Sequence, residues 1–267
     1  MASTVTVHVS DRIATITLNR PRTLNAVTAE DYDAFANALR EIDQNDEVLV
    51  TVWQATGKWF CAGTDVRRSG SSSSLESIGS VRKALKNNVV STTMDCGKAL
   101  YSHSKILVAA LNGPVMAFLG YFDFIYAMPN AWLAVPFTFL GIVAEGGSSV
   151  SFVNRMGLAT ANEVLLWGKK KTADQLYTCG FYNEIFPEQS TESFHAAVQS
   201  KLLAELVGLD PDALLVMRAL IRRGVHEKND PDAVNLRESY AQAARFASGK
   251  PYEQFARIAA KEIKHKL

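Results

Sequence analysis

"WFCAGTD" (residues 59–65) is the stretch on which the fold assignment depends. It follows VLVTVWQA (48–55), an apolar, β-branched run that predicts a buried strand. Gly63 would allow a ligand to approach the backbone closely. A second junction has the same form, because the strand predicted for KILVAALNG (105–113) breaks at Asn-Gly-Pro and a helix is expected to follow. Backbone N–H groups at two such junctions can converge on an oxygen that gains negative charge, although each is also compatible with an ordinary tight turn.

The rest of the chain predicts a β/α body followed by helices. VTVHV and IATITL form a β-hairpin around Ser10–Arg12, and Thr28 caps a helix with Asp31 at its third position. Further elements are expected as helices at about 75–101, 146–157 and 160–167, strands at 123–127 and 132–135, and a helix–glycine–strand unit at 172–187. From about residue 191 the pattern predicts four helices. We therefore expect an α/β (α+β) fold with a core at 1–190 and a helical C-terminal region at 191–267.

Composition excludes several classes of function. A net charge of +1 on 267 residues gives no reason to expect nucleic acid as a partner. The most apolar stretch, 106–137, is interrupted by polar and turn-forming residues, so no membrane span is expected. The five histidines are scattered, and no metal site is predicted. The three cysteines are widely spaced and indicate reduced thiols, with Cys61 conceivable as a nucleophile.

Glu145 is the only charged side chain between Asp123 and Arg155. A carboxylate among apolar residues is costly to desolvate, which raises its pKa, while the N-terminus of the helix expected after Gly146 would oppose that rise. Such a group is suited to proton transfer in a site from which water is excluded. The alternative is a structural carboxylate that caps the helix or pairs with Arg155 or the lysines at 169–171.

The motifs together resemble the crotonase superfamily of enoyl-CoA hydratases and isomerases. The resemblance covers about residues 5–190 and is carried, in order, by FCAGTD (60–65), NGP (112–114), PFTFLG (136–141) and GFYNEIFP (180–187). PFTFLGIVAEGGSSVSF (136–152) is most similar to the catalytic segment of the peroxisomal Δ3,Δ2-enoyl-CoA isomerases.

The resemblance implies a crotonase-like spiral of ββα turns, closed by C-terminal helices that mediate trimerisation, with a homotrimer or hexamer as the assembly. It implies an acyl-CoA substrate whose thioester oxygen lies between the backbone N–H groups of Thr64 and Phe118. Glu145 would move the proton, with no cofactor beyond the coenzyme A of the substrate. The loop beside the CoA arm would be lined by Ala62, Gly63, Asp65 and Val66.

The C-terminal tripeptide His265-Lys266-Leu267 is similar to the S-K-L peroxisomal address. An amphipathic basic helix can also end in this way. With the family resemblance, the tripeptide predicts a peroxisomal location and recognition by the peroxisomal import receptor.

Two departures from the family pattern bear on activity. The segment between Asn112 and Asp123 is about four residues shorter than expected, roughly one helical turn, so the helix holding Phe118 would be shortened or shifted. The two glutamates of a hydratase are absent, since the corresponding stretches read AFLGYF (117–122) and Phe137. We therefore expect an isomerase that shifts a C3 double bond to C2. The alternatives are a crotonase-fold hydratase or hydrolase acting on a specialised acyl-CoA, and a catalytically silent acyl-CoA-binding subunit.

Overall fold

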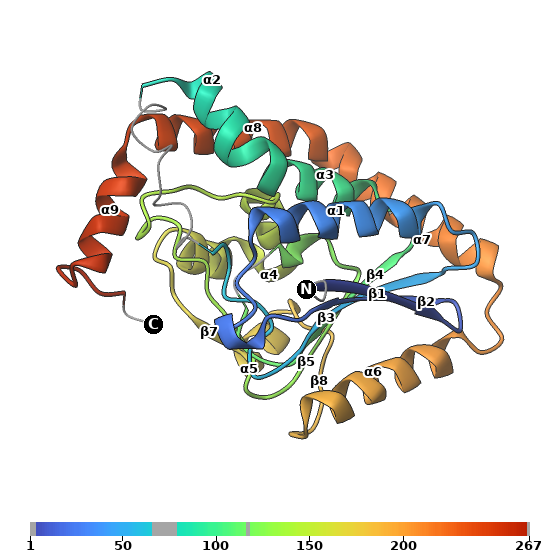
Figure 1. Cartoon of the computed structure of the whole chain (residues 1–267). Helices are drawn as coiled ribbons and strands as arrows, with labels where there is room; N and C mark the ends of the chain where they lie inside the picture. The colour runs from blue at the N-terminus through green and yellow to red at the C-terminus, as the bar shows by residue number, and fades with distance from the viewer. Residues whose placement is uncertain (1–3, 66–78, 116–117, 266–267) are drawn as a thin grey trace.

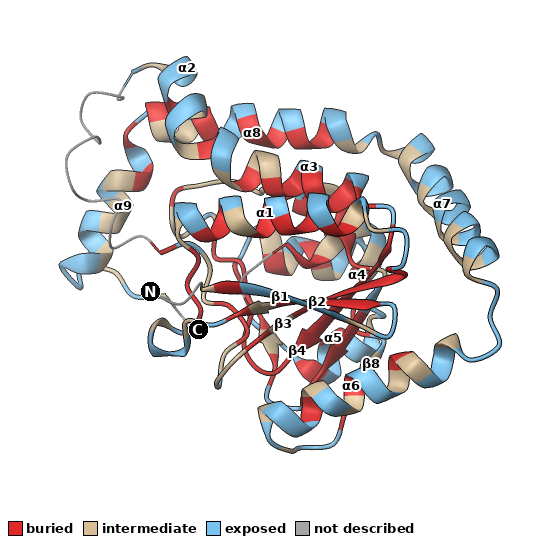
Figure 2. Cartoon of the chain, turned by 45° about the vertical axis from the view of Figure 1, so that its right-hand side comes forward, coloured by how far each residue is buried: buried red, intermediate tan, exposed pale blue. Residues whose placement is uncertain are grey.

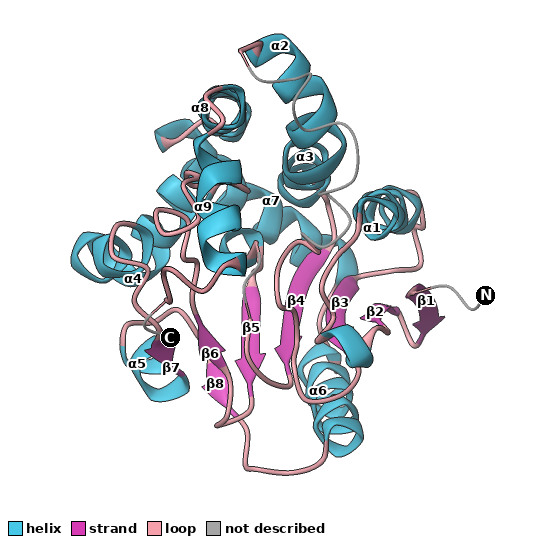
Figure 3. Ribbon diagram, turned by 60° about the vertical axis from the view of Figure 1, so that its left-hand side comes forward, coloured by secondary structure: helices cyan, strands magenta, loops and turns pink. Residues whose placement is uncertain are grey.

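The computed structural model describes residues 4–65, 79–115 and 118–265. Its main sheet has the strand order β1-β2-β3-β4-β5-β8, in which β1 is antiparallel to β2 and the remaining neighbours are parallel. These strands span Val5–Ser10, Ile13–Leu18, Val50–Ala55, Ile106–Leu111, Phe124–Ala127 and Glu184–Ile185. A second sheet pairs β6 (Trp132–Leu133) with β7 (Lys171–Thr172). Figure 3 shows the parallel strands side by side, with helices on both faces of the sheet.

The predicted N-terminal elements are confirmed. β1 and β2 form the hairpin, and Asp11 and Arg12 turn the chain with φ values of 50° and 65°. A short 3-10 turn (η1, Pro21–Thr23) precedes α1 (Ala29–Asp43), which begins at the predicted capping box of Thr28 and Asp31. The apolar side of α1 packs on the sheet.

Both faces of the sheet are covered, as the sequence of β4 requires. Leu107, Ala109 and Leu111 belong to the core beneath α1, α3 and α4, and the alternating residues Ile106, Val108 and Ala110 face the opposite core. The opposite core is closed by α6 (Thr191–Leu206). Figure 1 shows α6 on the side of the sheet away from α1.

Among the described residues, the helix expected at about 75–101 begins at Val81, and it contains a long irregular segment. It consists of α2 (Val81–Ala84), a π-helical segment η2 (Leu85–Met94) and α3 (Asp95–Ser102). Ala84 and Val89 pack against Ala243 and Ala247 of α8 (Pro231–Ala247). This contact lets α8 lie closely along the segment (Figure 1).

Up to residue 265, where the described part of the chain ends, four helices follow β8, as predicted: α6, α7 (Pro211–Lys228), α8 and α9 (Lys250–Ala259). No residue of α7 is buried, and Figure 2 shows this helix in the exposed and intermediate colours. The predicted boundary near residue 190 falls in the connection between β8 and α6, and its meaning as a domain boundary stays a prediction.

One local prediction was wrong. The helix expected after Asn112-Gly-Pro is replaced, in the part of this segment that the structure describes, by a single 3-10 turn, η3 (Leu119–Tyr121). The segment between Asn112 and Asp123 is about four residues shorter than the family pattern, so it is too short for a further helical turn. The predicted break at Gly157 is confirmed, because Gly157, at φ 74° and ψ 158°, has a non-helical backbone and divides α4 (Ser148–Leu165) into two helices. The unit at 172–187 forms as predicted, with α5 at Ala173–Thr178 before β8.

Candidate active site

In the part of the chain that the structure describes, the Thr64 amide of the WFCAGTD loop has no acceptor. Val27 donates its N–H to the Gly63 carbonyl at 2.9 Å, and Asp65 donates to the Val27 carbonyl at 2.9 Å. In such a parallel bridge the N–H of the intervening residue points away from the partner strand. Thr64 is exposed, and none of the described residues accepts from its N–H. The loop therefore presents the Thr64 N–H as a donor toward solvent, and its role as an oxyanion donor stays a prediction.

Tyr32 of α1 holds this loop through a hydrogen bond between side chains. Its buried hydroxyl lies 2.7 Å from Thr64 Oγ1, and its ring centroid lies 6.0 Å from that of Phe118. Burial, followed by the nearby charge of Glu145, raises the pKa of Tyr32, so the phenol stays neutral. Tyr32 thus links the two predicted donor segments and lies near the predicted base, although the sequence indicated only a core position for it.

Cys61 does not have the properties of a nucleophile. The side chain is 1% exposed, and burial raises the pKa of its thiol to about 12. Its sulfur accepts the N–H of Gly63 at 3.3 Å. The thiol is therefore protonated at neutral pH and helps to shape the Thr64 turn.

Phe118 lies against the Glu145 segment. A Cβ added to Gly146 would overlap the Phe118 ring, so the two residues are in direct contact. The Phe118 N–H has no acceptor among the residues that the structure describes, and Met116 and Ala117 lie outside them. Although the described part of this segment contains only the η3 turn, Phe118 lies next to the residue that follows Glu145.

The backbone around Glu145 is held in a tight turn. Ser148 donates both its N–H (3.1 Å) and its hydroxyl (2.7 Å) to the Glu145 carbonyl. Gly146 and Gly147, with φ values of 60° and 74°, reverse the chain before α4 begins at Ser148. The two glycines in the sequence are explained by this turn and by the contact with Phe118.

The Glu145 carboxyl group is half-buried and is bonded to an amide from the C-terminal region. Gln242 of α8 donates its Nε2 to Glu145 Oε2 at 2.8 Å. Burial raises the pKa of Glu145 to about 7, the Gln242 hydrogen bond opposes that rise, and the charge of Glu238 adds to it. A carboxyl group with a pKa near neutrality can both accept and return a proton.

The ion-paired alternative for Glu145 is not what the structure contains. Arg155 donates to the carbonyls of Phe122 and Phe181, and Lys169 and Lys171 pair with Glu163. Capping of α4 is also performed by another residue. Glu238 accepts from the N–H groups of Gly147 (2.7 Å) and Ser149 (2.9 Å). Because Glu238 accepts these amides, the predicted opposing effect of the helix N-terminus on the pKa of Glu145 stays a prediction.

The residues expected beside a CoA arm lie on one loop but differ in what they present. Ala62 and Gly63 are half-buried, and the Ala62 N–H donates to the Leu24 carbonyl at 3.0 Å. Asp65 is 8% exposed, and its carboxylate lies 3.5 Å from the Arg20 guanidinium, so its charge faces the protein interior. Val66 lies outside the described residues.

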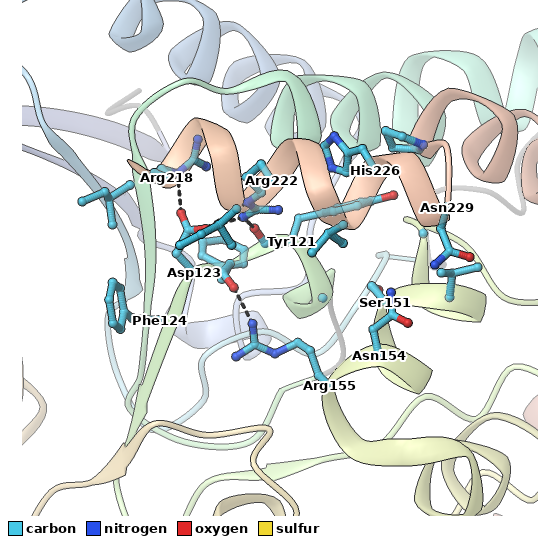
Figure 4. A pocket seen from close by; sticks show the side chains of 18 of the residues that line it. Tyr121, Asp123, Phe124, Ser151, Asn154, Arg155, Arg218, Arg222, His226 and Asn229 are labelled. Carbon is cyan, nitrogen blue, oxygen red and sulfur yellow. Dashed lines mark hydrogen bonds and ion pairs between the residues drawn. The ribbon is translucent and has the colours of Figure 1, made fainter. Parts of the chain in front are cut away.

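A separate cavity of about 440 Å³ lies between α4, α7 and the start of β5 (Figure 4). The charged side chains at one end of this cavity are paired with one another, because Asp123 accepts hydrogen bonds from Arg218 at 2.7 Å and from Arg222 at 2.9 Å. Within the described ranges, no group of three or more histidine, cysteine or acidic side chains could hold a metal ion. The same residues include no helix long and apolar enough to cross a bilayer.

Comparison with known proteins identifies the family. Residues 8–246 match the enoyl-CoA hydratase/isomerase family. The chain is 38% identical to Delta(3,5)-Delta(2,4)-dienoyl-CoA isomerase of Pyricularia oryzae, over 100% of both chains. It is 29% identical to 3,2-trans-enoyl-CoA isomerase of Saccharomyces cerevisiae, covering 94% of this chain and 92% of the relative. It is 30% identical to mouse enoyl-CoA delta isomerase 3, peroxisomal, covering 92% of this chain and 74% of that one.

A solved structure of an enoyl-CoA hydratase/isomerase from Pseudoalteromonas atlantica superposes with a TM-score of 0.83 at 26% identity, covering 99% of this chain and 100% of that one. The predicted fold class and the predicted closeness to enoyl-CoA isomerases are confirmed by these matches. The chain belongs to the enoyl-CoA hydratase/isomerase family.

Proposed function

We propose that the protein is an enoyl-CoA isomerase that moves a C3 double bond of an acyl-CoA to the conjugated C2 position, with Glu145 as its single proton carrier. The observation that carries this proposal is one half-buried carboxyl group, with its pKa raised to about 7, beside the segment that contains Phe118. The isomerase names of the relatives support the reaction class.

In this mechanism the thioester oxygen accepts hydrogen bonds from the Thr64 and Phe118 amides, and each donor stabilises the developing enolate by ~3 kcal/mol. Glu145 takes a proton from C2. The electrons of the broken C–H bond pass into the thioester and give a dienolate, whose negative charge lies on the thioester oxygen. Glu145 then returns the proton to C4: the electrons of the C3–C4 double bond form the new C4–H bond, and the dienolate electrons form the C2–C3 double bond. Because Glu145 begins and ends ionised, one residue completes the cycle and no cofactor takes part.

Two other reactions of the family are less well supported. Hydration uses two glutamates to activate water, and the corresponding stretches here read AFLGYF (117–122) and Phe137. Isomerisation of a 3,5-dienoyl-CoA is the second candidate, favoured by the name of the 38% identical relative. That reaction returns the proton two carbons farther along the chain. Glu238 is the acidic residue whose charge acts on Glu145. Both of its oxygens already accept backbone N–H groups, so it is not free to return that proton.

The test is to incubate the purified protein separately with a 3-enoyl-CoA and a 3,5-dienoyl-CoA and to follow the conjugated products by absorbance. We expect turnover of the 3-enoyl-CoA to be at least ~10-fold faster, a difference of about 1.4 kcal/mol in the barrier. Faster turnover of the dienoyl substrate would replace the proposal with the second candidate. Binding of both substrates without turnover would indicate a silent acyl-CoA-binding subunit.

We further propose a homotrimer or hexamer in which α7 contacts a second copy of the chain. This helix has no buried residue, and its exposed apolar side chains recur at helical spacing: Met217, Leu220, Ile221 and Val225.

A peroxisomal location is proposed from the C-terminal tripeptide and is supported by the name of the mouse relative. Of the three residues, His265 packs edge-on against Phe139 with ring centroids 4.7 Å apart. Lys266 and Leu267 lie outside the described residues.

A further inference from the structure

We propose that Gln242 of α8 is a positioning residue for the reaction: it holds one oxygen of Glu145, so that the other oxygen alone carries the proton. The proposal rests on the function proposed above. It adds a residue from the helical C-terminal region, about a hundred positions from Glu145 in the sequence, to a site otherwise built by the N-terminal body.

The hydrogen bonds of Gln242 fix the orientation of its amide. Its Oε1 accepts the N–H of Val143 at 3.1 Å, so this atom must be the carbonyl oxygen. The NH₂ group therefore faces Glu145 and donates to Oε2 at 2.8 Å. Gln242 is 2% exposed, so water does not compete for these bonds. Glu145 Oε1 has no hydrogen-bond partner among the described residues.

Gln242 is one of three side chains by which α8 holds the segment around Glu145. Arg245 donates its Nε to the Gly141 carbonyl at 2.7 Å, and Glu238 accepts the amides of Gly147 and Ser149. Glu238 and Gln242 are four residues apart and so lie on one face of the helix. The segment from Gly141 to Ser149 is thereby fixed on both sides of Glu145.

The groups around Glu145 differ in their effect on its charge. Glu238, from the same helix as Gln242, repels a second negative charge and raises the pKa of Glu145. Tyr32, from α1, is neutral, because burial and then the charge of Glu145 raise its pKa. Gln242 provides a donor to the carboxylate, and this bond favours the ionised form that accepts a proton from C2. A donor on Oε2 also disfavours protonation of that atom, which leaves Oε1 as the proton-carrying oxygen.

The experiment compares Gln242→Met with Gln254→Met. Methionine keeps the length of glutamine and removes both the donor and the acceptor. Gln254 of α9 is a matched control because its Nε2 donates to the Phe139 carbonyl at 2.9 Å, in the same loop, without contacting a carboxylate. The pH dependence of kcat/KM with 3-enoyl-CoA is measured for each protein, together with the titration of Glu145 by NMR of carboxyl-labelled glutamate, assigned by its loss in Glu145→Gln.

We expect Gln242→Met to move the low-pH fall of kcat/KM, and the Glu145 titration, upward by about one pH unit, because hydrogen bonds to charged groups contribute ~1.5–3 kcal/mol and one unit is ~1.4 kcal/mol. Gln242→Glu should move both in the same direction, since two facing carboxyl groups must share a proton. Gln254→Met should leave both at the wild-type position. An unchanged titration in Gln242→Met, or an equal shift in Gln254→Met, would overturn the proposal. The NMR titration needs no turnover, so it gives this answer even if the proposed isomerase activity is not found.

Discussion

Replacement of Glu145 by glutamine is expected to lower kcat for 3-enoyl-CoA isomerisation by about 10³-fold, within the range of general acid–base contributions. Glutamine has the shape of glutamate and can still accept the Gln242 amide through its oxygen, so the local hydrogen bond survives while the base is lost. KM should change little, because the proposed Thr64 and Phe118 donors are untouched. The measurement is the initial rate of formation of the conjugated thioester.

The same variant should be more stable than the wild type at alkaline pH, which separates loss of the base from loss of folding. The pKa of Glu145 is raised in the folded protein from 4.5 to about 7, so the folded state holds this proton more tightly than the unfolded chain. The raised pKa therefore lowers the free energy of unfolding of the wild type. This loss is absent below pH 4.5, the pKa in the unfolded chain, grows as the pH rises from 4.5 to 7, and is complete above pH 7. After allowance for the partial exposure of the carboxyl group, Glu145→Gln should gain about 2 kcal/mol at pH 8 and nothing at pH 4. Equal stability at both values would contradict the raised pKa.

Substitution of Gly146 by alanine is expected to lower kcat/KM by about 10²-fold, the loss that a misplacement of about 1 Å can cause. The new Cβ would overlap the Phe118 ring, and φ at this residue is 60°, a value that residues with a Cβ rarely adopt. Phe118 and Glu145 should therefore move relative to each other. The backbone alone should cost ~1–3 kcal/mol of stability. Steady-state kinetics and urea unfolding measure the two effects.

Gly208→Ala is the matched control for that substitution. Gly208 also has a positive φ, 77°, but no atom lies within 4 Å of its added Cβ. It lies in the turn between α6 and α7. We expect a similar loss of stability with kcat/KM close to the wild-type value. A comparable fall in activity in both variants would mean that the Gly146 effect is one of stability and does not depend on contact with Phe118.

Local signals predicted the elements that local chemistry determines. The capping box at Thr28 fixes the start of α1, and the uninterrupted apolar run of β4 indicates a strand buried on both faces. The isolation of Glu145 in the sequence also predicted its half-buried position and raised pKa, because no neighbour along the chain could neutralise it.

The contacts that complete the site join residues far apart in the chain, and the patterns in a single sequence do not predict such contacts. Gln242 and Glu238 carry an i, i+4 signal that places them on one face of a helix, but this signal does not say which loop they meet. Tyr32 fits the apolar periodicity of α1 whether it is only a core residue or also the hydrogen-bond partner of Thr64, so the pattern does not distinguish the two. The π-helical course of Leu85–Met94 likewise follows no local pattern.

The central claim is that Glu145 removes a proton from C2 and returns it to C4. It is tested most directly by a single turnover of 3-enoyl-CoA deuterated at C2, in ordinary water, with the product examined by NMR. The account predicts that part of the deuterium appears at C4 with the wild-type protein and that no such transfer occurs with Glu145→Gln. Undiminished transfer of deuterium to C4 in Glu145→Gln would contradict the account, because another group would then be carrying the proton.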